Sequence, residues 1–141
     1  MSDRPRLVFD TNCLISHLLL PKSVPAQAVG VAVRRGQLLA SEDTLAELAD
    51  VLARPRFDHY IALEDRMEFL RKFGRIVEVV PITTRVQACR DPRDDKFLEL
   101  GLSGNTTAII SGDNDLLVLH PFGTVQTLAP ADYLSQLADR P

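Results

Sequence analysis

Short apolar runs alternate along the chain with longer segments in which apolar residues recur at helical spacing. A short continuous apolar run is typical of a buried strand, whereas recurrence every third or fourth residue indicates a helix with one buried face. The runs predict strands at residues 6–10, 37–41, 75–82, 106–113 and 123–128. The periodic segments predict helices at residues 12–20, 25–36, 42–53, 63–74, 91–105 and 130–140.

Proline and glycine residues mark several of the predicted helix ends. Pro25 lies near the start of the second helical segment and Gly36 just past its end. Pro55 follows the third segment, and Gly74 is expected to close the fourth. Strands that alternate with helices of this length predict a parallel sheet covered on both faces. We therefore expect a three-layer α/β/α fold around a central, mainly parallel sheet of four to five strands.

Length and composition are those of an ordinary globular chain. Of the 141 residues, 45% are hydrophobic and 25% are charged, so we expect residues 1–141 to form a single domain. The formal net charge of -3 gives no global positive field, so a nucleic-acid partner would need a local basic patch. Two cysteines are too few for a disulfide framework. No run approaches ~18 apolar residues and no cleavage-site pattern is seen, so we expect no membrane span, no signal peptide and a cytoplasmic protein.

Acidic residues follow the predicted strands or open the helix between them. Asp10 ends the first strand, and Asp113 follows the fourth, with Asp115 two residues further on. Asp91 and Asp94 open the helix that precedes the fourth strand. In open parallel sheets, functional groups gather outside the carboxyl ends of the strands. We therefore expect these carboxylates to meet at one edge of the sheet.

Glu47, on the helix directly after the second strand, adds a fourth stretch of chain to this acidic set. Two carboxylates about 4 Å apart repel by roughly 4 kcal/mol at an effective dielectric of ~20, so four of them need a compensating cation. Oxygen ligands alone select hard cations such as Mg²⁺ or Mn²⁺. Such an ion suits hydrolysis of a phosphodiester, because it polarises the phosphoryl oxygen and lowers the pKa of its bound water.

Most of these acids also have a structural explanation. Asp91, Pro92 and Asp94 form a helix start, with a capping residue, a proline at the first position and an acid that complements the helix dipole. Asp113 and Asp115 fit turn residues, or caps for the segment "NDLLVL".

A purely structural role explains Glu47 easily and Asp10 poorly. Thr44 and Glu47 fit a capping box, which would leave Glu47 as a solvated helix residue. Asp10 is the hardest to explain structurally, because it interrupts a strand at its buried end, where a lone charge is costly. From the residues alone, we expect an acidic site made by Asp10, Asp94 and Asp113, and the membership of Glu47 stays open.

Four segments of the sequence together resemble the PIN-domain family. They are "LVFDTNCLIS", "SEDTLAELADVLARPRF", "CRDPRDDKFLELGL" and "AIISGDNDLLVL". They stand in that family's order and spacing, and the resemblance runs from about Arg6 to Leu134. It is strongest to a short prokaryotic branch related to the VapC-type toxins of toxin–antitoxin systems. The resemblance implies a Mg²⁺- or Mn²⁺-dependent endoribonuclease that hydrolyses RNA phosphodiester bonds, on a parallel sheet flanked by helices.

The resemblance also implies particular site residues. The four acids that serve the family as catalytic residues and metal ligands fall on Asp10, Glu47, Asp94 and Asp113. Auxiliary positions fall on Asn12, Asp91, Asp95, Ser111 and Asp115. Asp95 leaves open which of two neighbouring acids is the ligand. One departure from the family pattern is Gly101, where a small alanine is more usual.

An RNA substrate has to reach this negative site, and a bound metal ion reverses the local charge. Basic residues at the rim are expected to hold the flanking phosphates, and the candidates are Arg54, Arg56, Arg93 and Lys96. Relatives of this kind are usually dimers, so the resemblance implies a homodimer. A toxin would also have a cognate antitoxin protein as its partner.

Two other classes of function remain as alternatives. The domain could be a binding module whose acidic groove holds a partner's basic segment and which cleaves little or no RNA. It could also be a phosphatase or phosphotransfer domain, since these use an aspartate after the first strand. The haloacid-dehalogenase-like phosphatases need a second aspartate two residues later, where this chain has Asn12. A receiver domain would need a lysine after a late strand, and the late strands here supply Asp113 and no lysine.

Overall fold

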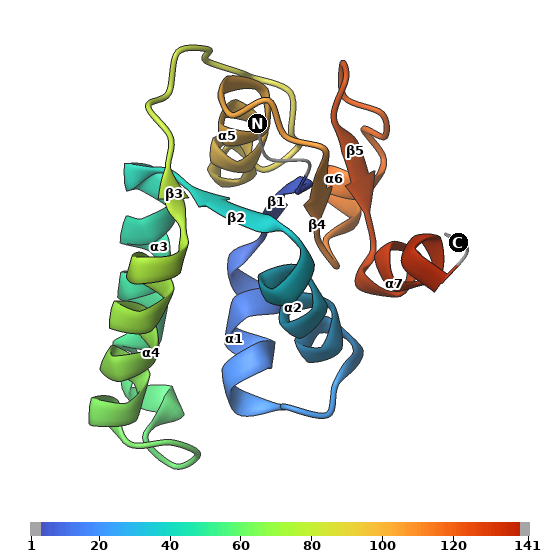
Figure 1. Ribbon diagram of the computed structural model, residues 1–141. Helices are drawn as coiled ribbons and strands as arrows, with labels where there is room; N and C mark the ends of the chain where they lie inside the picture. The colour runs from blue at the N-terminus through green and yellow to red at the C-terminus, as the bar shows by residue number, and fades with distance from the viewer. Residues whose placement is uncertain (1–3, 139–141) are drawn as a thin grey trace.

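The computed structural model describes residues 4–138, which form a five-stranded sheet flanked by helices (Figure 1). The strand order is β3-β2-β1-β4-β5, and every neighbouring pair is parallel. This confirms the predicted three-layer α/β/α fold around a parallel sheet. The strands are β1 (Arg6–Phe9), β2 (Gln37–Ala40), β3 (Glu78–Val79), β4 (Ala108–Ile110) and β5 (Gln126–Leu128).

Helices connect the strands in alternation, as the sequence pattern predicts. The α-helices are α1 (Thr11–Leu19), α2 (Val24–Arg35), α3 (Glu42–Leu52), α4 (Leu63–Ile76), α5 (Asp95–Ser103), α6 (Asn114–Leu117) and α7 (Pro130–Ala138). Two short 3-10 helices precede α4 and α5, namely η1 (Pro55–Phe57) and η2 (Pro92–Asp94). The last two residues of the helix predicted at 130–140 lie outside the described residues.

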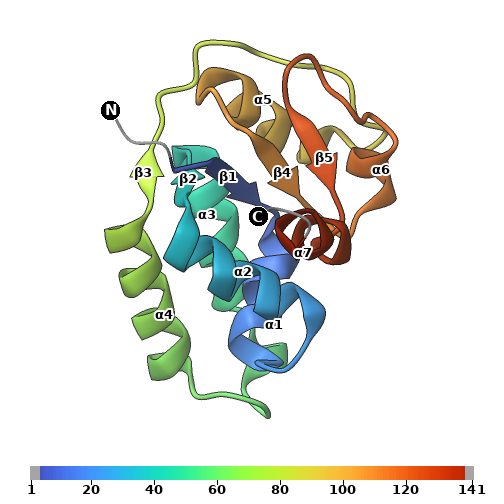
Figure 2. The ribbon, with the colours of Figure 1, turned by 45° about the vertical axis from the view of Figure 1, so that its right-hand side comes forward.

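Alternation of side chains along the central strands divides the core into two parts. On β1, Leu7 and Phe9 belong to a core that α1, α2, α3 and α7 cover, whereas Val8 belongs to the core under α5 and α6. Strands β2 and β4 alternate in the same way. Figures 1 and 2 show α5 on one side of the sheet and α1 with α2 on the other. Because both faces are covered, the strands read as continuous apolar runs rather than as alternating ones.

The strand predicted at 75–82 is much shorter in the structure. Only Glu78 and Val79 pair with β2 as a strand, followed by a single hydrogen bond from the amide of Val80 to the carbonyl of Ala40 at 2.8 Å. Pro81 comes next and has no amide hydrogen to continue the ladder. Of the apolar residues in this segment only Val80 is buried, whereas Ile76 and Val79 are exposed, so the apolar run does not mark one long buried strand.

The helix predicted to close at Gly74 continues past it to Ile76. The amide of Val77 still donates to the carbonyl of Phe73 at 3.1 Å, which completes the last turn. A glycine inside a helix costs only about 1 kcal/mol, and burial of Phe73 beside it outweighs that cost. The helix predicted at 91–105 also differs, because its first turn is the 3-10 helix η2 and regular α5 begins at Asp95.

Between β3 and η2 the chain forms no regular element and arches over α5, as Figures 1 and 2 both show. We call residues 81–90 of this segment the strap. Three side chains of α5 accept hydrogen bonds from backbone amides of the strap. Ser103 accepts the amides of Thr83 and Thr84 at 3.0 and 3.3 Å, and Glu99 accepts that of Val86 at 3.1 Å. Asp95 accepts the amides of Ala88 and Cys89 at 3.1 and 2.8 Å. These acceptors are four residues apart, so they share one face of the helix. The strap delivers the chain to η2 at the carboxyl edge of the sheet.

The order of the strands creates a crevice between β1 and β4. Chain connections leave β1 toward β2 on one side, whereas β4 and β5 extend the sheet on the other side. At such a switch point the connections after the two strands diverge and leave an open space outside their carboxyl ends. Asp10 follows β1, and Ser111 follows β4. The fold therefore brings these two segments to the expected site.

Candidate active site

A pocket of about 740 Å³ opens at this crevice, outside the carboxyl ends of β1 and β4. Its lining comes from the ends of β1 and β4, from one face of α3, and from η2 with the start of α5. Five of the predicted acidic site residues line it: Asp10, Glu47, Asp91, Asp94 and Asp113. Asn12, Arg54, Arg93 and Lys96 line it too. Two acids of α3 that the sequence did not single out, Asp43 and Asp50, complete the negative lining.

Asp10 is fixed from two sides. One carboxylate oxygen accepts the amide of Cys13 at 2.8 Å and so caps the N-terminus of α1. The other oxygen accepts a short hydrogen bond from the Ser111 hydroxyl, across the crevice from β1. Asp10 is only 5% exposed, and a helix N-terminus favours a negative charge beside it. Hydrogen bonds from the first turn of α1 and from Ser111 thus replace water around this carboxylate at the buried end of the strand.

Ser111 also fixes the second acid of the crevice. Its Oγ accepts the amide of Asp113 at 2.9 Å, and Asp113 Oδ1 accepts the amide of Asp115 at 2.9 Å. Asp113 is thus the N-cap of α6, as its structural explanation predicted. The cap uses only Oδ1 of Asp113, and the same residue lines the pocket. The capping role and a place in the acidic pocket are compatible.

The tightest acidic group in the described residues is Asp94, Asp113 and Asp115, whose carboxylate oxygens lie within 4.8 Å of one another. Burial, together with the neighbouring Asp113, raises the pKa of Asp94 to about 7, and Asp91 and Glu47 add to this shift. Burial and a neighbouring carboxylate both disfavour the ionised form of a carboxyl group, and such shifted groups are common at functional sites. Asp115, expected as an auxiliary residue, therefore belongs to the closest group, and Asp10 lies beside it through Ser111.

Glu47 reaches the pocket from α3 and is not a capping residue. The capping box of α3 is formed by Ser41 and Thr44, so the predicted pairing of Thr44 with Glu47 is wrong. Glu47 instead accepts a short hydrogen bond from the Thr11 hydroxyl and an ion-paired hydrogen bond from Lys96 Nζ at 2.9 Å. Lys96 is thus a partner of one of the predicted acids rather than a free residue at the rim.

The two neighbouring acids Asp94 and Asp95 point to different places. Asp94 lines the pocket, whereas Asp95 turns to the strap and is buried there. Burial works to raise the pKa of Asp95, but the amides of Cys89 and Ala88 outweigh it and the pKa is lowered. Asp91 caps η2 through the amide of Arg93 and pairs with the Arg93 guanidinium, which lowers the pKa of Asp91.

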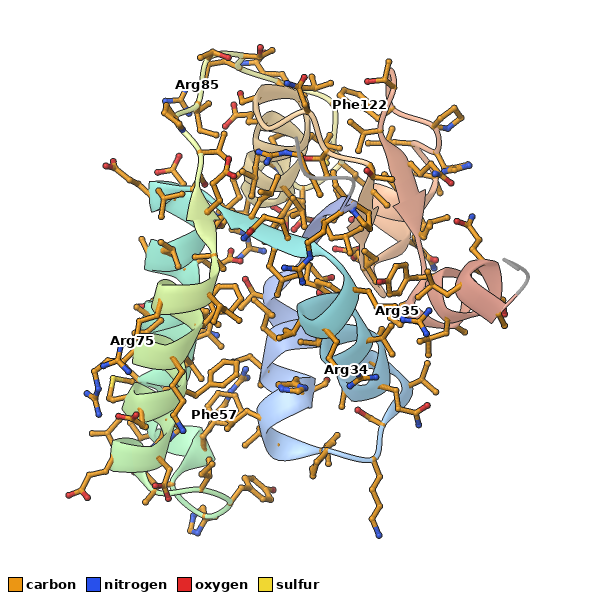
Figure 3. The ribbon with its side chains drawn as sticks, in the orientation of Figure 1. Arg34, Arg35, Phe57, Arg75, Arg85 and Phe122 are labelled. Carbon is orange, nitrogen blue, oxygen red and sulfur yellow. The ribbon has the colours of Figure 1, made fainter. Side chains whose placement is uncertain are left out.

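The predicted basic residues divide in a similar way. Arg54 and Arg93 line the pocket but are paired with Asp50 and Asp91, respectively. Arg56 is not among the pocket-lining residues, and its guanidinium lies over the Phe57 ring, 4.8 Å from the ring centre. Figure 3 shows Phe57 at the end of the molecule that carries the start of α4.

One basic residue near the cluster was not predicted from the sequence. Arg90, the last residue of the strap, donates two hydrogen bonds to Asp115. A signal for it exists in the segment "CRDPRDD", where an arginine directly precedes the acid-rich helix start. That signal does not say which acid the arginine contacts, because Asp115 lies 25 residues further along the chain.

The donor set fits a hard divalent cation. All the candidate ligands are carboxylate oxygens, three of them within 4.8 Å of one another, and the pKa of Asp94 is raised by its burial first and by the neighbouring acids second. Mg²⁺ and Mn²⁺ prefer such oxygen ligands, whereas zinc and copper prefer sites that include nitrogen or sulfur. No cysteine lines this pocket.

Residues 6–115 match the PIN domain. The chain belongs to the PIN-domain family. PIN domains are generally metal-dependent nucleases, which supports a hydrolase of that class. The match covers β1 through the start of α6, and β5 and α7 extend the same sheet and its helical layer beyond it.

The chain is also similar to individual proteins and structures. The chain is 28% identical over 116 residues to the uncharacterized protein MJ1680 of Methanocaldococcus jannaschii, covering 81% of this chain and 74% of that protein. The fold of this chain is similar to that of a chain in the crystal structure of VapBC2 from Rickettsia felis bound to a DNA fragment from the VapBC2 promoter. The TM-score is 0.59 at 10% sequence identity, and the alignment covers 86% of this chain and 98% of the other. The PIN domain of T. brucei RRP44 aligns with a TM-score of 0.47, 12% identity, and coverage of 96% and 82%.

Within residues 4–138, the structure offers no helix with the length and apolar character that a membrane crossing requires.

Proposed function

We propose that this protein is a Mg²⁺- or Mn²⁺-dependent endoribonuclease that hydrolyses RNA phosphodiester bonds. The observation that carries the proposal is the acidic group at the switch point of the sheet. Three carboxylates there have oxygens within 4.8 Å of one another, and the buried Asp10 is held beside them. Membership of a family of nucleases supports the reaction class.

In this proposal Asp10, Asp94 and Asp113 hold the metal ion, and Glu47 completes the acidic ring. A bound Mg²⁺ or Mn²⁺ would polarise the phosphoryl oxygen and activate water for attack on phosphorus. The Ser111 hydroxyl donates to the Asp10 carboxylate and accepts the backbone amide of Asp113. One side chain therefore sets the spacing of two acids. Thr11 holds Glu47 in the same sense. Asp115 serves as a further acid at the edge of this group.

The basic residues of the pocket are proposed to bind the RNA backbone. Arg54 and Arg93 lie at the rim, where about half of the Arg54 side chain and most of the Arg93 side chain are exposed. Each can therefore leave its acidic partner for a phosphate at little cost. Lys96 lies deeper and is paired with Glu47. We propose that it neutralises this acid and directs the phosphate toward the three close carboxylates.

The proposal extends to the cellular role of a toxin in a toxin–antitoxin system. The resemblance of the sequence to VapC-type toxins supports it, and the shared fold with a VapBC2 structure is in keeping with it. A homodimer and a cognate antitoxin protein are part of this proposal. Expression of the wild-type chain should slow the growth of a bacterial host, whereas Asp10→Asn should not.

The direct test is cleavage of a mixed pool of single-stranded RNA by the purified protein. Mg²⁺ and Mn²⁺ are compared with a chelator, and Asp10→Asn and Asp113→Asn are prepared in parallel. We expect cleavage that needs the metal and falls at least about 100-fold in each variant, because even an outer-shell partner of a metal ligand typically costs 10–100-fold when removed. Asp132→Asn, an exposed acid on α7, is the matched control and should cleave like the wild type.

A binding module is the second candidate, and one observation favours it. Two acids of the site already contact basic side chains, Glu47 with Lys96 and Asp115 with Arg90, as a partner's basic segment would. Cleavage that requires metal and vanishes in Asp10→Asn contradicts this candidate. Metal binding without cleavage of any RNA in the pool would favour it over the nuclease.

A further inference from the structure

An exposed arginine is paired with the outermost acid of the cluster. Arg90 Nε donates to Asp115 Oδ1 at 3.0 Å, and Arg90 Nη2 donates to Asp115 Oδ2 at 3.2 Å. Two parallel bonds of this kind are the most favourable geometry between a guanidinium and a carboxylate. The Arg90 side chain is nevertheless 86% exposed, whereas that of Asp115 is 20% exposed, so the bond ties a solvated arginine to a largely covered acid and contributes little to folding stability. Its position suggests a role at the site instead.

The backbone beside Arg90 is held, although its side chain is exposed. The amides of Ala88 and Cys89, two residues and one residue earlier, both donate to the buried Asp95. On the other side, Asp91 caps η2. Arg90 therefore starts from a fixed point at the edge of the acidic group, and only its long side chain is free to change partner.

The partner of Arg90 carries charge that a divalent cation would also claim. An Asp115 oxygen lies within 4.8 Å of oxygens of Asp94 and Asp113. A cation among these carboxylates supplies the positive charge that Arg90 supplies without it, and it repels the guanidinium. A released guanidinium at this edge faces the ligand that matches its geometry best, the phosphate of an RNA strand approaching the metal.

We propose that Arg90 is an exchangeable counter-ion. It neutralises Asp115 while the acidic group holds no cation, and it binds an RNA phosphate once a divalent cation is bound. The inference rests on the proposed function and adds Arg90 to it as a substrate-binding residue. It also gives an order of events, in which metal binding prepares the RNA site.

The test measures two ligands on Arg90→Ala. Mn²⁺ binding is measured by calorimetry without RNA, and binding of a short single-stranded RNA is measured by fluorescence anisotropy with Ca²⁺ in place of Mg²⁺, with a gel to check that the RNA stays intact. We expect Mn²⁺ to bind about two- to fivefold more tightly, because a competing positive charge is gone. RNA should bind about fivefold more weakly, and the slope of log K against log salt should shrink by about 0.7, the loss of one phosphate contact.

Two further variants separate this role from others. Arg90→Lys keeps the charge but not the two-bond fork, so Mn²⁺ affinity should stay near the wild type and RNA affinity should recover in part. Arg71→Ala removes one exposed, ion-paired arginine from α4, which does not line the pocket, and should leave both affinities unchanged.

The opposite signs of the two effects make the inference falsifiable. If both ligands bind Arg90→Ala more weakly, Arg90 only maintains the structure of the strap, and the inference is wrong. If the wild type binds RNA and Arg90→Ala binds it equally well with the same salt slope, the inference is wrong while the proposed function stands. If the wild type binds Mn²⁺ but no RNA, the proposed function fails and the RNA half of this inference fails with it.

Discussion

Adjacent residues with the same side chain do different work in this protein. Asp94 lies in the pocket with a raised pKa, and Asp95 is buried under the strap with a lowered one. Burial works to raise both pKa values, but Asp94 also meets another carboxylate, whereas Asp95 accepts two backbone amides that outweigh its burial. Sequence alone left open which of them would bind the metal.

Substitution of each residue in turn separates the two roles. Asp94→Asn should weaken Mn²⁺ binding at least about tenfold, and it should not destabilise the metal-free protein, because it removes repulsion with Asp113. Asp95→Ala should lower the free energy of unfolding by about 1–3 kcal/mol, since two amides lose their acceptor, and it should change Mn²⁺ affinity little. Calorimetry and urea denaturation measure the two quantities. The reverse pattern would mean that Asp95 is the ligand.

The raised pKa of Asp94 also predicts how stability depends on pH. Its pKa is about 7 in the folded protein against an ordinary value of 3.8, so between these values the folded state binds a proton that the unfolded state has lost. Stability therefore falls as pH rises through this window, and the fall ends above about pH 7. In chelator, the thermal midpoint of the wild type should drop from pH 5 to pH 8 relative to that of Asp94→Asn. Parallel curves for the two proteins would contradict the assignment.

At the scale of elements, the strap and α5 form one unit. Ser103, Glu99 and Asp95 accept strap amides from one face of the helix. Arg85 joins this unit from the strap side, with an ion pair to Glu99 at 3.2 Å, and Figure 3 shows it on the arch above β3. The strap is the segment that brings Arg90 and Asp91 to the acidic group, so its attachment sets their position.

Glu99→Ala tests this attachment. The change leaves the amide of Val86 without its acceptor and breaks the pair with Arg85, so we expect a loss of about 1–2 kcal/mol in unfolding free energy. Amide hydrogen exchange should quicken across the strap and stay unchanged in β1 and β4. Glu99→Gln keeps an acceptor oxygen and should lose less than half as much. Equal exchange rates in all three proteins would show that the strap does not depend on α5.

The elements that the sequence predicted well are those whose pattern is local. The apolar runs at β1, β2 and β4 and the apolar stripes of the longer helices follow directly from burial of a sheet on both faces. The sequence overstated β3, because its apolar residues serve other contacts and Pro81 ends the pairing. It could not reveal the attachment of the strap to α5, since an acid at position 95 or 99 looks the same whether it meets water or a backbone amide.

The candidate site was predictable to the same extent. Asp10 and Asp113 follow strands, and the rule that functional groups gather at strand ends predicts them without any family. Glu47 required the family resemblance, because locally it is one more polar helix residue. The contacts of Arg90 with Asp115 and of Lys96 with Glu47 join segments 25 and 49 residues apart, and no local pattern predicts them.

At the scale of the whole molecule, a buried arginine joins α4 to α3, the helix that lines one side of the pocket. Arg66 of α4 is fully buried, and Nη1 donates to the carbonyls of Leu52 and Arg54 at 2.8 and 2.9 Å, at the C-terminal end of α3. It also pairs with Asp58 in the loop between the two helices. Positive charge is favourable at a helix C-terminus, so Arg66 fastens α4 to α3.

Arg66→Met should therefore destabilise the protein as a whole. Two carbonyls and one carboxylate lose their partner, and we expect the free energy of unfolding to fall by about 2–4 kcal/mol in urea denaturation. Arg71→Met, an exposed arginine on the same helix, should change it by less than about 1 kcal/mol. Similar losses in the two variants would show that burial of Arg66 has no special role.

The central claim is that the acids at the switch point hold a divalent cation. The most direct measurement is the anomalous difference density of Mn²⁺ in crystals of the protein. The account predicts a peak among the carboxylates of Asp10, Asp94 and Asp113, and a much weaker peak in Asp113→Asn crystals. Crystals that are saturated with Mn²⁺ and show no peak in this pocket would contradict it.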